Sequence, residues 1–169
     1  GGARPVTRME TSRSARLRVV PFRPELAPHF SRLNREWIER LFAIEAADQA
    51  LLDDPGGTIV DQGGMIFFAL EGEEVQGTCA AMRLDAGRFE LAKMGVTPAA
   101  QGKGIGRRLG LAAIEFARQA GAREIVLHTS SRLAPALHLY DQLGFVKQPM
   151  PPGGDYIRSD IYMVRPLND

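Results

Sequence analysis

Three glycines alternate with other residues in the segment from Gln101 to Arg108, which reads QGKGIGRR. A strand-like run ends at Val96 just before this segment, and a helix-like pattern begins at Ile105 within it. Backbone without side chains at a helix N-terminus exposes N–H groups that lack partners, next to the positive end of the helix dipole. The segment therefore predicts an anion site of the kind that holds a phosphate ligand.

Three glycine-rich phosphate motifs compete for this segment. A P-loop needs a lysine and a serine or threonine after its last glycine, where this chain has Arg107 and Arg108. A dinucleotide site needs its third glycine where Arg107 stands, and an acidic residue at the end of the next strand, which here ends in His128. The interpretation that remains is a site for the pyrophosphate of coenzyme A.

Two motifs together resemble one family. The pattern Gln101-x-x-Gly104-x-Gly106, followed across one predicted strand by the segment LYDQLGF at 139–145, is similar to that of the GCN5-related N-acetyltransferases (GNAT). The resemblance runs from about Leu17 to Leu167 and implies the acyl-CoA N-acyltransferase fold. That fold is an α/β architecture with a mixed, mostly antiparallel central sheet of about seven strands, helices on both faces and splayed central strands around acetyl-CoA.

The resemblance assigns a set of residues to acetyl-CoA, the acyl donor. Backbone amides from Gly102 to Arg107 are expected to hold the pyrophosphate, and the strand ending at Val96 is expected to pair with the pantetheine amides. Lys103, Arg107 and Arg108 either add charge-assisted contacts or lie on a solvated helix start. The complete expected set is Met94, Val96, Gln101, Gly102, Lys103, Gly104, Ile105, Gly106, Arg107 and Ser130.

Ser130 is a departure from the family pattern. Relatives often place an asparagine just after the strand that follows the pyrophosphate helix, whereas this chain has Thr129-Ser130-Ser131. A serine hydroxyl can still donate and accept a hydrogen bond to the coenzyme A arm.

Tyr140 is the candidate catalytic acid. By spacing alone it belongs to an apolar helix stripe and would be a core tyrosine. The resemblance instead places it against the thioester sulfur, where it can protonate the departing thiolate. A phenol of pKa ~10 and a thiol of pKa ~8.5 differ by only about 1.5 units, so this proton transfer is feasible.

Glu90 is the candidate base, in the strand before the glycine segment. The attacking amine must be neutral, which costs roughly 4–5 kcal/mol for a lysine-like amine at neutral pH and about 1.4 kcal/mol for an α-amine. A base is therefore useful for some acceptors and nearly dispensable for others. The alternative for Glu90 is a surface carboxylate or a partner of Lys93.

The acceptor is either a small-molecule amine or an amine of a peptide or protein, and the sequence does not choose. Trp37 and Phe42 are assigned to the core, with the acceptor pocket as the alternative, and the loop Pro149–Gly154 is either a lid or a plain connection. Four acids either attract a cationic acceptor or form a solvated helix face, the commoner arrangement: Glu45, Asp48, Asp53 and Asp54.

The leading hypothesis is an enzyme that moves the acetyl group of acetyl-CoA to a primary amine by direct attack in a ternary complex. No acyl-enzyme is expected, because the one cysteine, Cys79, lies outside the motifs and reads as a small buried hydrophobe. The rival hypothesis is a non-catalytic acyl-CoA-binding or sensing domain that regulates a partner. A homodimer is possible under either.

Composition narrows the alternatives. Lys and Arg number 21 against 20 Asp and Glu, a net charge of +1, which argues against a general nucleic-acid or anionic-membrane binder. The 3 histidines lack metal-ligand spacing, so no metal site is expected. Without a long apolar run or a signal-peptide pattern, the expected location is cytoplasmic.

The elements that must position these residues follow from hydrophobic periodicity and from glycine and proline stops. Residues 17–169 are expected to form a single domain and residues 1–16 a disordered tail, of which 1–8 need not be native because Met9 could be the natural start. The expected helices are 25–41, 45–52, 105–120 and 133–143, and the expected strands are 17–22, 65–70, 75–84, 88–96, 124–128, 145–147 and 156–164.

Overall fold

The computed structural model describes residues 16–154 and 156–167, so the predicted tail lies outside the described residues apart from Arg16. Within them, seven strands form one sheet in the order β1-β2-β3-β4-β5-β7-β6. Only the β4–β5 pair is parallel. The strands are β1 (Leu17–Pro21), β2 (Met65–Glu71), β3 (Glu74–Asp85), β4 (Arg88–Val96), β5 (Glu124–Thr129), β6 (Val146–Gln148) and β7 (Ile161–Pro166).

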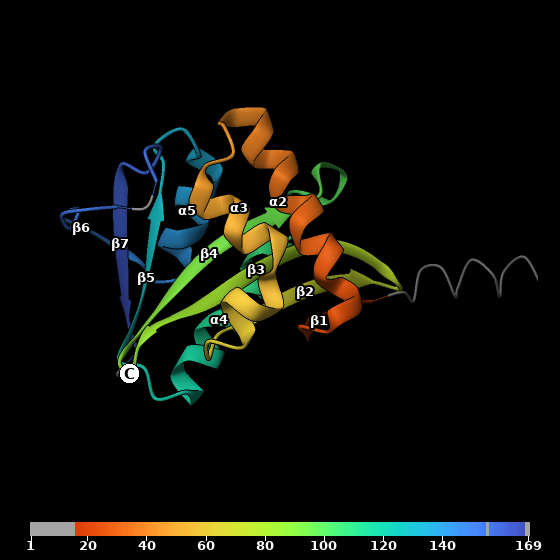
Figure 1. The fold of residues 1–169 in the computed structure, drawn as a ribbon, viewed down its shortest axis with the longest axis horizontal. Coiled ribbons are helices and arrows are strands. Elements are labelled where there is room, and N and C mark those ends of the chain that lie inside the picture. Colours follow the sequence, from red (N-terminus) through yellow and green to blue (C-terminus); the bar gives the residue numbers. More distant parts are fainter. Residues whose placement is uncertain (1–15, 155, 168–169) are drawn as a thin grey trace, which may run out of the picture.

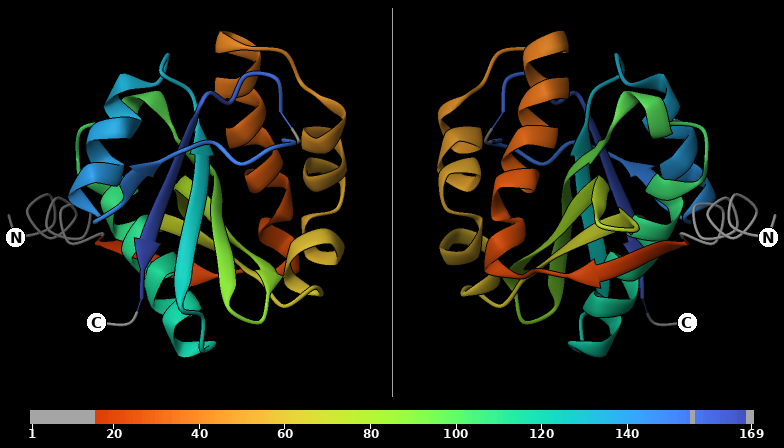
Figure 2. Two further views of the ribbon diagram at one scale, coloured as in Figure 1. Left: turned by 90° about the vertical axis from the view of Figure 1, so that its left-hand side faces the viewer. Right: turned by 90° about the vertical axis from the view of Figure 1, so that its right-hand side faces the viewer.

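Helices cover both faces of this sheet (Figures 1 and 2), as predicted. α2 (Ala27–Leu41) and α3 (Ala46–Asp53) lie on one face, and α4 (Ile105–Gln119) and α5 (Ala134–Gln142) lie on the other. Three short helical turns complete the described elements: η1 (Pro24–Leu26), η2 (Gly56–Val60) and η3 (Pro98–Ala100). None of the described helices is long and apolar enough to cross a membrane.

Each helix layer closes one hydrophobic cluster against the sheet. Under α2, Phe30 packs with Ile66 and Phe68 of β2, all three fully buried. Under α4, Leu109 packs with Phe89 of β4 and with the rest of a second buried cluster. Burying each such side chain contributes roughly 1.5–3 kcal/mol to folding, so the two clusters fix the sheet between its helices.

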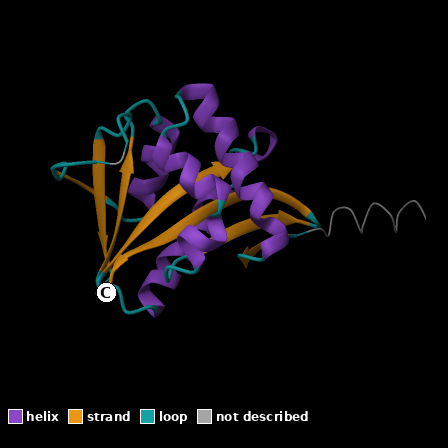
Figure 3. Cartoon of the chain, viewed as in Figure 1, coloured by secondary structure: helices purple, strands orange, loops and turns teal. Residues whose placement is uncertain are grey.

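β4 and β5 pair over only three residue pairs, from Arg88↔Glu124 to Glu90↔Val126. Beyond Glu90 the two strands diverge, and Figures 1 and 3 show them spreading apart from the end of the molecule where the C-terminus lies. The central strands therefore form a V with Glu90 at its apex, as the predicted fold requires.

A bulge interrupts β4 inside this V. Ala80 pairs with Ala92 and Thr78 pairs with Gly95, so two residues of β4, Lys93 and Met94, stand opposite one residue of β3. Lys93 has a backbone φ of 56°, a value that residues other than glycine seldom adopt. An extra residue reverses the alternation of faces after it, so that the Lys93 side chain reaches α3 on the α2 face. The sequence did not predict this bulge.

The predicted strand from Tyr156 begins later than expected, at Ile161. The preceding residues are irregular, because the Ile157 amide and the Arg158 side chain bond to carboxylates of the α3 region and not to a neighbouring strand. The other predicted strands and helices agree with the structure within about two residues, the usual uncertainty of an element boundary.

Candidate active site

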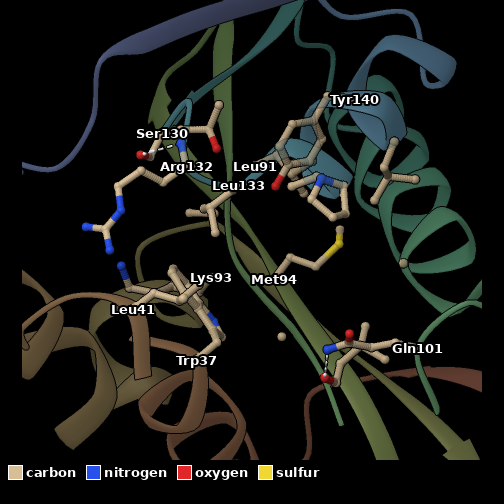
Figure 4. A pocket seen from close by; sticks show the side chains of 18 of the residues that line it. Trp37, Leu41, Leu91, Lys93, Met94, Gln101, Ser130, Arg132, Leu133 and Tyr140 are labelled. Carbon is tan, nitrogen blue, oxygen red and sulfur yellow. Dashed lines mark hydrogen bonds between the residues drawn. The ribbon is translucent and has the colours of Figure 1, made fainter. Parts of the chain in front are cut away.

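A cavity of about 580 Å³ occupies the V between β4 and β5. Figure 4 shows Met94, Gln101 and Tyr140 on one side of it and Trp37, Leu41 and Lys93 on the other. All predicted site residues line this cavity except Lys103, which is exposed and lies outside the lining. No group of three or more His, Cys, Asp or Glu within the described ranges could hold a metal ion.

The glycine segment forms one mouth of the cavity. Gly102 and Gly104 have φ values of +81° and +79°, and a Cβ at either position would meet no atom within 4 Å. Gly104 is the N-cap of α4 and provides no side-chain cap for the first amides of the helix. These two glycines are required by their backbone conformation, and they leave a bare, open helix N-terminus, which suits a phosphate group.

Gly106 is required for a different reason. A Cβ there would lie 3.0 Å from the Leu139 side chain of α5 and 3.3 Å from the Met94 sulfur. The absence of a side chain lets α4, α5 and β4 approach closely around the cavity.

The polar side chains of this segment differ in what they contact. Gln101 donates to the Val96 carbonyl at 3.2 Å, closing the loop onto the end of β4. Arg107 lines the cavity, whereas Arg108 donates to the Leu17 carbonyl of β1 at 2.9 Å. Of the three cations considered for the anion site, Arg107 alone lines the cavity.

Tyr140 projects from α5 with its hydroxyl directed into the cavity (Figure 4), and its ring contacts Phe145 edge-on. Burial raises the pKa of Tyr140 to about 12. The phenol therefore stays protonated at neutral pH, as a proton donor must.

Ser130 lies at the end of β5 and is 4% exposed. Its Oγ accepts a hydrogen bond from the Arg132 amide at 3.1 Å. The adjacent Ser131 donates to both carboxylate oxygens of Asp160, at 2.8 and 2.6 Å. The β5–α5 turn is thus held rigidly where Ser130 and Arg132 face the cavity.

A buried ionic network forms the wall opposite Tyr140. Asp48 of α3 is fully buried. It accepts two hydrogen bonds from Arg158, at 2.8 and 2.7 Å, and lies 2.7 Å from the Lys93 ammonium. Lys93 also donates to the Tyr156 hydroxyl at 3.0 Å, and Arg158 lies 3.3 Å from Glu45. The network joins α3, the β4 bulge and the segment 156–158.

The pKa values reflect this mutual compensation. Burial by itself would raise the pKa of Asp48, but hydrogen bonds from Arg158 and Lys93 outweigh it and lower the pKa to about 2. Burial lowers the pKa of Lys93, against the stabilising charges of Asp48 and Glu90. Each buried charge thus has an opposite charge within contact distance, as burial demands.

The idea that four acids attract a cationic acceptor is wrong for this structure. Asp48 is enclosed by two cations, and Glu45 bonds to Arg158 and to the Ile157 amide. The alternative of a solvated face is also wrong for Asp48. Asp53 lies 3.6 Å from Arg35, and Asp54 caps the Gly57 amide.

Aromatic rings complete the same wall. The Arg158 guanidinium lies 4.4 Å from the Tyr156 ring centre and 5.8 Å from that of Trp37. Phe42 contacts Trp37 edge-on and carries the Arg132 guanidinium 4.5 Å above its ring. Trp37 and Phe42 line the cavity, the alternative considered for them. Residues 149–154, considered as either a lid or a plain connection, do not line it.

One signal in the sequence could have identified Asp48. It lies four residues before Leu52, which is buried, and therefore on the same face of α3. A carboxylate at a buried position requires a buried cation, but nothing in the sequence indicates which of its 21 Lys and Arg that is.

Comparison with known proteins identifies similar chains. Residues 24–145 match the profile of the Acetyltransferase (GNAT) family. The uncharacterized N-acetyltransferase YjgM of Escherichia coli is 33% identical over 123 residues, which cover 64% of this chain and 74% of YjgM. A mycothiol acetyltransferase of Arthrobacter is 41% identical over 58 residues, but these span only 18% of that protein and 34% of this chain.

Solved structures share the fold. A GNAT-family acetyltransferase from Staphylococcus aureus superimposes with a TM-score of 0.81 at 19% identity, covering 90% of this chain and 100% of its own. The structure of YncA from Salmonella typhimurium, with its cofactor acetyl-CoA, gives a TM-score of 0.74 at 21% identity, covering 90% and 95%. At these identities the superpositions establish the seven-stranded fold.

Proposed function

Because this chain belongs to the acetyltransferase (GNAT) family, we propose that it transfers the acetyl group of acetyl-CoA directly to a primary amine. The observation that carries the proposal is the divergence of β4 and β5 beyond Glu90. This divergence opens one cavity onto which the bare helix N-terminus, Tyr140 and Glu90 all face. Donor and acceptor can therefore meet within it.

The residues present fit coenzyme A. The uncapped start of α4 and the open space at Gly102 and Gly104 suit a pyrophosphate, with Arg107 as an added cation. Met94 and Val96 lie on the half of β4 that has left β5. Its outward backbone groups, apart from the Val96 carbonyl that accepts from Gln101, are available to an amide-containing arm.

The bound thioester supplies an activated acetyl group, and the protein's residues manage two protons. As the amine nitrogen forms its bond to the carbonyl carbon, the carbon–sulfur bond breaks and the sulfur leaves with the electron pair. Tyr140 donates a proton toward that sulfur. Glu90, at the apex of the V, accepts the proton that the amine loses, directly or through water.

A covalent acyl-enzyme is not part of the proposal. Cys79 is fully buried and donates to the Leu109 carbonyl at 3.4 Å. Burial also raises the pKa of its thiol, so the nucleophilic thiolate is disfavoured.

The test is acetyl transfer by the purified protein. Incubation with acetyl-CoA and a panel of primary amines is expected to release coenzyme A thiol and to give acetylated amine of the correct mass. If acetyl-CoA binds in calorimetry while thiol release stays at background across the panel, the protein is a non-catalytic acyl-CoA-binding or sensing domain.

Gly104→Ala is expected to weaken acetyl-CoA binding at least about 10-fold, because the added methyl group enters the space where a phosphate approaches the backbone. Gly121→Ala is the matched control at the other end of α4. Gly121 has a φ of +85° and equally open surroundings.

Both substitutions are expected to cost about 1–2 kcal/mol of stability through left-handed backbone strain. Calorimetry measures the affinity of each variant for acetyl-CoA. Because both variants carry the same backbone strain, a difference in affinity reports the loss of ligand contact at Gly104. Equal affinities for the two variants would contradict a phosphate site at Gly104.

A further inference from the structure

The half of the cavity opposite Tyr140 is rich in cations. Arg40, Lys93, Arg132 and Arg158 line this half, which we call the acceptor end together with Trp37, Leu41, Phe42 and Tyr156. Glu90 is the one acidic residue among the described residues that line the cavity. The attraction of this end for an anion therefore depends on which of its cations are paired with acids outside the lining.

Three of these four cations are compensated by acids outside the cavity lining. Lys93 and Arg158 share Asp48, and Arg158 also contacts Glu45. Arg40 pairs with Glu36 one turn earlier in α2. Arg132, by contrast, has no carboxylate within ion-pair distance anywhere in the described ranges.

Arg132 is also held in place. Its amide donates to the Ser130 Oγ, which fixes the backbone of the turn, and its guanidinium lies over the Phe42 ring. The Arg158 guanidinium also lies near the same ring, 5.7 Å from the Phe42 ring centre. In Figure 4 the Arg132 side chain extends toward the Leu41 side of the cavity, away from Gln101. A guanidinium that lies over an aromatic ring retains N–H donors that can bind a planar anion.

We propose that the acceptor is a small amine that also carries a carboxylate, of which an amino acid is the simplest example, and that Arg132 binds that carboxylate. This inference rests on the proposed function, because it names the acceptor class of the same site. A carboxylate can accept two parallel N–H bonds from the fork of Arg132. Because the other three cations of the acceptor end already have acidic partners, Arg132 supplies the positive charge that favours an acceptor with an anionic group over a polycation.

The experiment uses matched acceptors that differ at the carboxylate. L-leucine and L-phenylalanine are compared with leucinamide and phenylalaninamide, and with 3-methylbutylamine and 2-phenylethylamine. The amides retain the α-amine in a less basic form, so amine basicity works against the expected preference. Wild-type protein is expected to show kcat/KM at least about 10-fold higher for the acids than for either partner.

Arg132→Gln is expected to lower kcat/KM for the acids by about 10- to 100-fold while changing the values for the partners that lack a carboxylate less than about threefold. Arg118→Gln removes an arginine near the far end of α4 and serves as the control. It is expected to leave both values unchanged.

Equal or better use of the amides and the simple amines by wild-type protein would overturn the proposal, as would an Arg132→Gln effect of the same size on all acceptors. If none of the acceptors is acetylated, the proposed function fails for this class. Calorimetry with coenzyme A present then tests the carboxylate site independently of catalysis. Binding of the acids that Arg132→Gln abolishes supports the site. Equal or undetectable binding of acids and amides overturns it.

Discussion

The Tyr140→Phe protein is expected to acetylate its acceptor about 100- to 1,000-fold more slowly than wild type, with nearly unchanged affinity for acetyl-CoA. The substitution removes one oxygen, and general acid catalysis typically contributes 10²–10⁴-fold. Phenylalanine preserves the edge-on contact with Phe145, so packing in this part of the core is retained. Steady-state kinetics for kcat and calorimetry for acetyl-CoA affinity measure the two quantities.

The pH profile tests the same role. Because burial raises the pKa of Tyr140 to about 12, its phenol remains protonated from pH 6 to about pH 10. No alkaline loss of activity from Tyr140 is expected in that range. Burial in the same cavity also disfavours the departing thiolate and so raises the pKa of the coenzyme A thiol. The pKa values of the Tyr140 phenol and of the thiol therefore move in the same direction.

Tyr162→Phe is the control, because Tyr162 lies in β7 and does not line the cavity. It is expected to retain turnover within about twofold. A Tyr140→Phe protein with wild-type kcat would exclude Tyr140 as the acid and leave protonation of the thiolate to water.

Replacing Asp48 with asparagine is expected to lower the free energy of unfolding by about 3–5 kcal/mol, a decrease in Tm of about 6–20 °C for a chain of this size. The change leaves Lys93 without a carboxylate in contact and leaves Arg158 with Glu45 as its remaining acidic partner, and the side chains of Lys93 and Arg158 are only 4% and 10% exposed. Thermal or denaturant unfolding at pH 7 measures the loss.

Asp53→Asn is the matched control in the same helix. Asp53 is 60% exposed and lies 3.6 Å from Arg35, so its replacement is expected to change stability by no more than about 0.5 kcal/mol. If the Asp48→Asn and Asp53→Asn proteins have the same Tm, the buried network contributes no net stability.

The wild-type network also predicts a pH dependence. The folded-state pKa of Asp48 is lowered from 3.8 to about 2, so its stabilisation is complete above about pH 4 and is lost as pH falls toward 2. That shift corresponds to about 2 kcal/mol. Asp48→Asn is expected to flatten this part of the stability profile, measured by denaturant unfolding between pH 2 and 5.

The sequence predicted the elements with strong periodicity well. α2 and α4 follow apolar stripes, and α4 ends just before Gly121, which has the positive φ expected of a helix terminator. The glycine segment was likewise predictable, since bare backbone at a helix start has few other uses. The roles of individual residues in the segment were not predictable. A side chain at position 106 would collide with Leu139 of another helix, and Lys103 lies outside the cavity lining.

The acceptor end could not be predicted, for physical reasons. The hydrogen bonds between Asp48 and Arg158 join residues 110 positions apart. The sequence around Lys93 contains no signal for the β4 bulge. A lysine in a strand is ordinarily predicted to be a surface residue. Tyr156 was assigned to the last strand, whereas contacts with carboxylates of the α3 region keep the segment after it irregular.

The three residue pairs that join β4 to β5 have a mechanical consequence. They are the only backbone ladder among the described residues that connects the β1–β4 half of the sheet to the β5–β7 half. A ligand that pairs with β4 and contacts the β5 side acts as a removable crosslink between these halves. It is expected to slow amide exchange in both strands together and to raise Tm with ligand concentration, as binding to the native state alone requires.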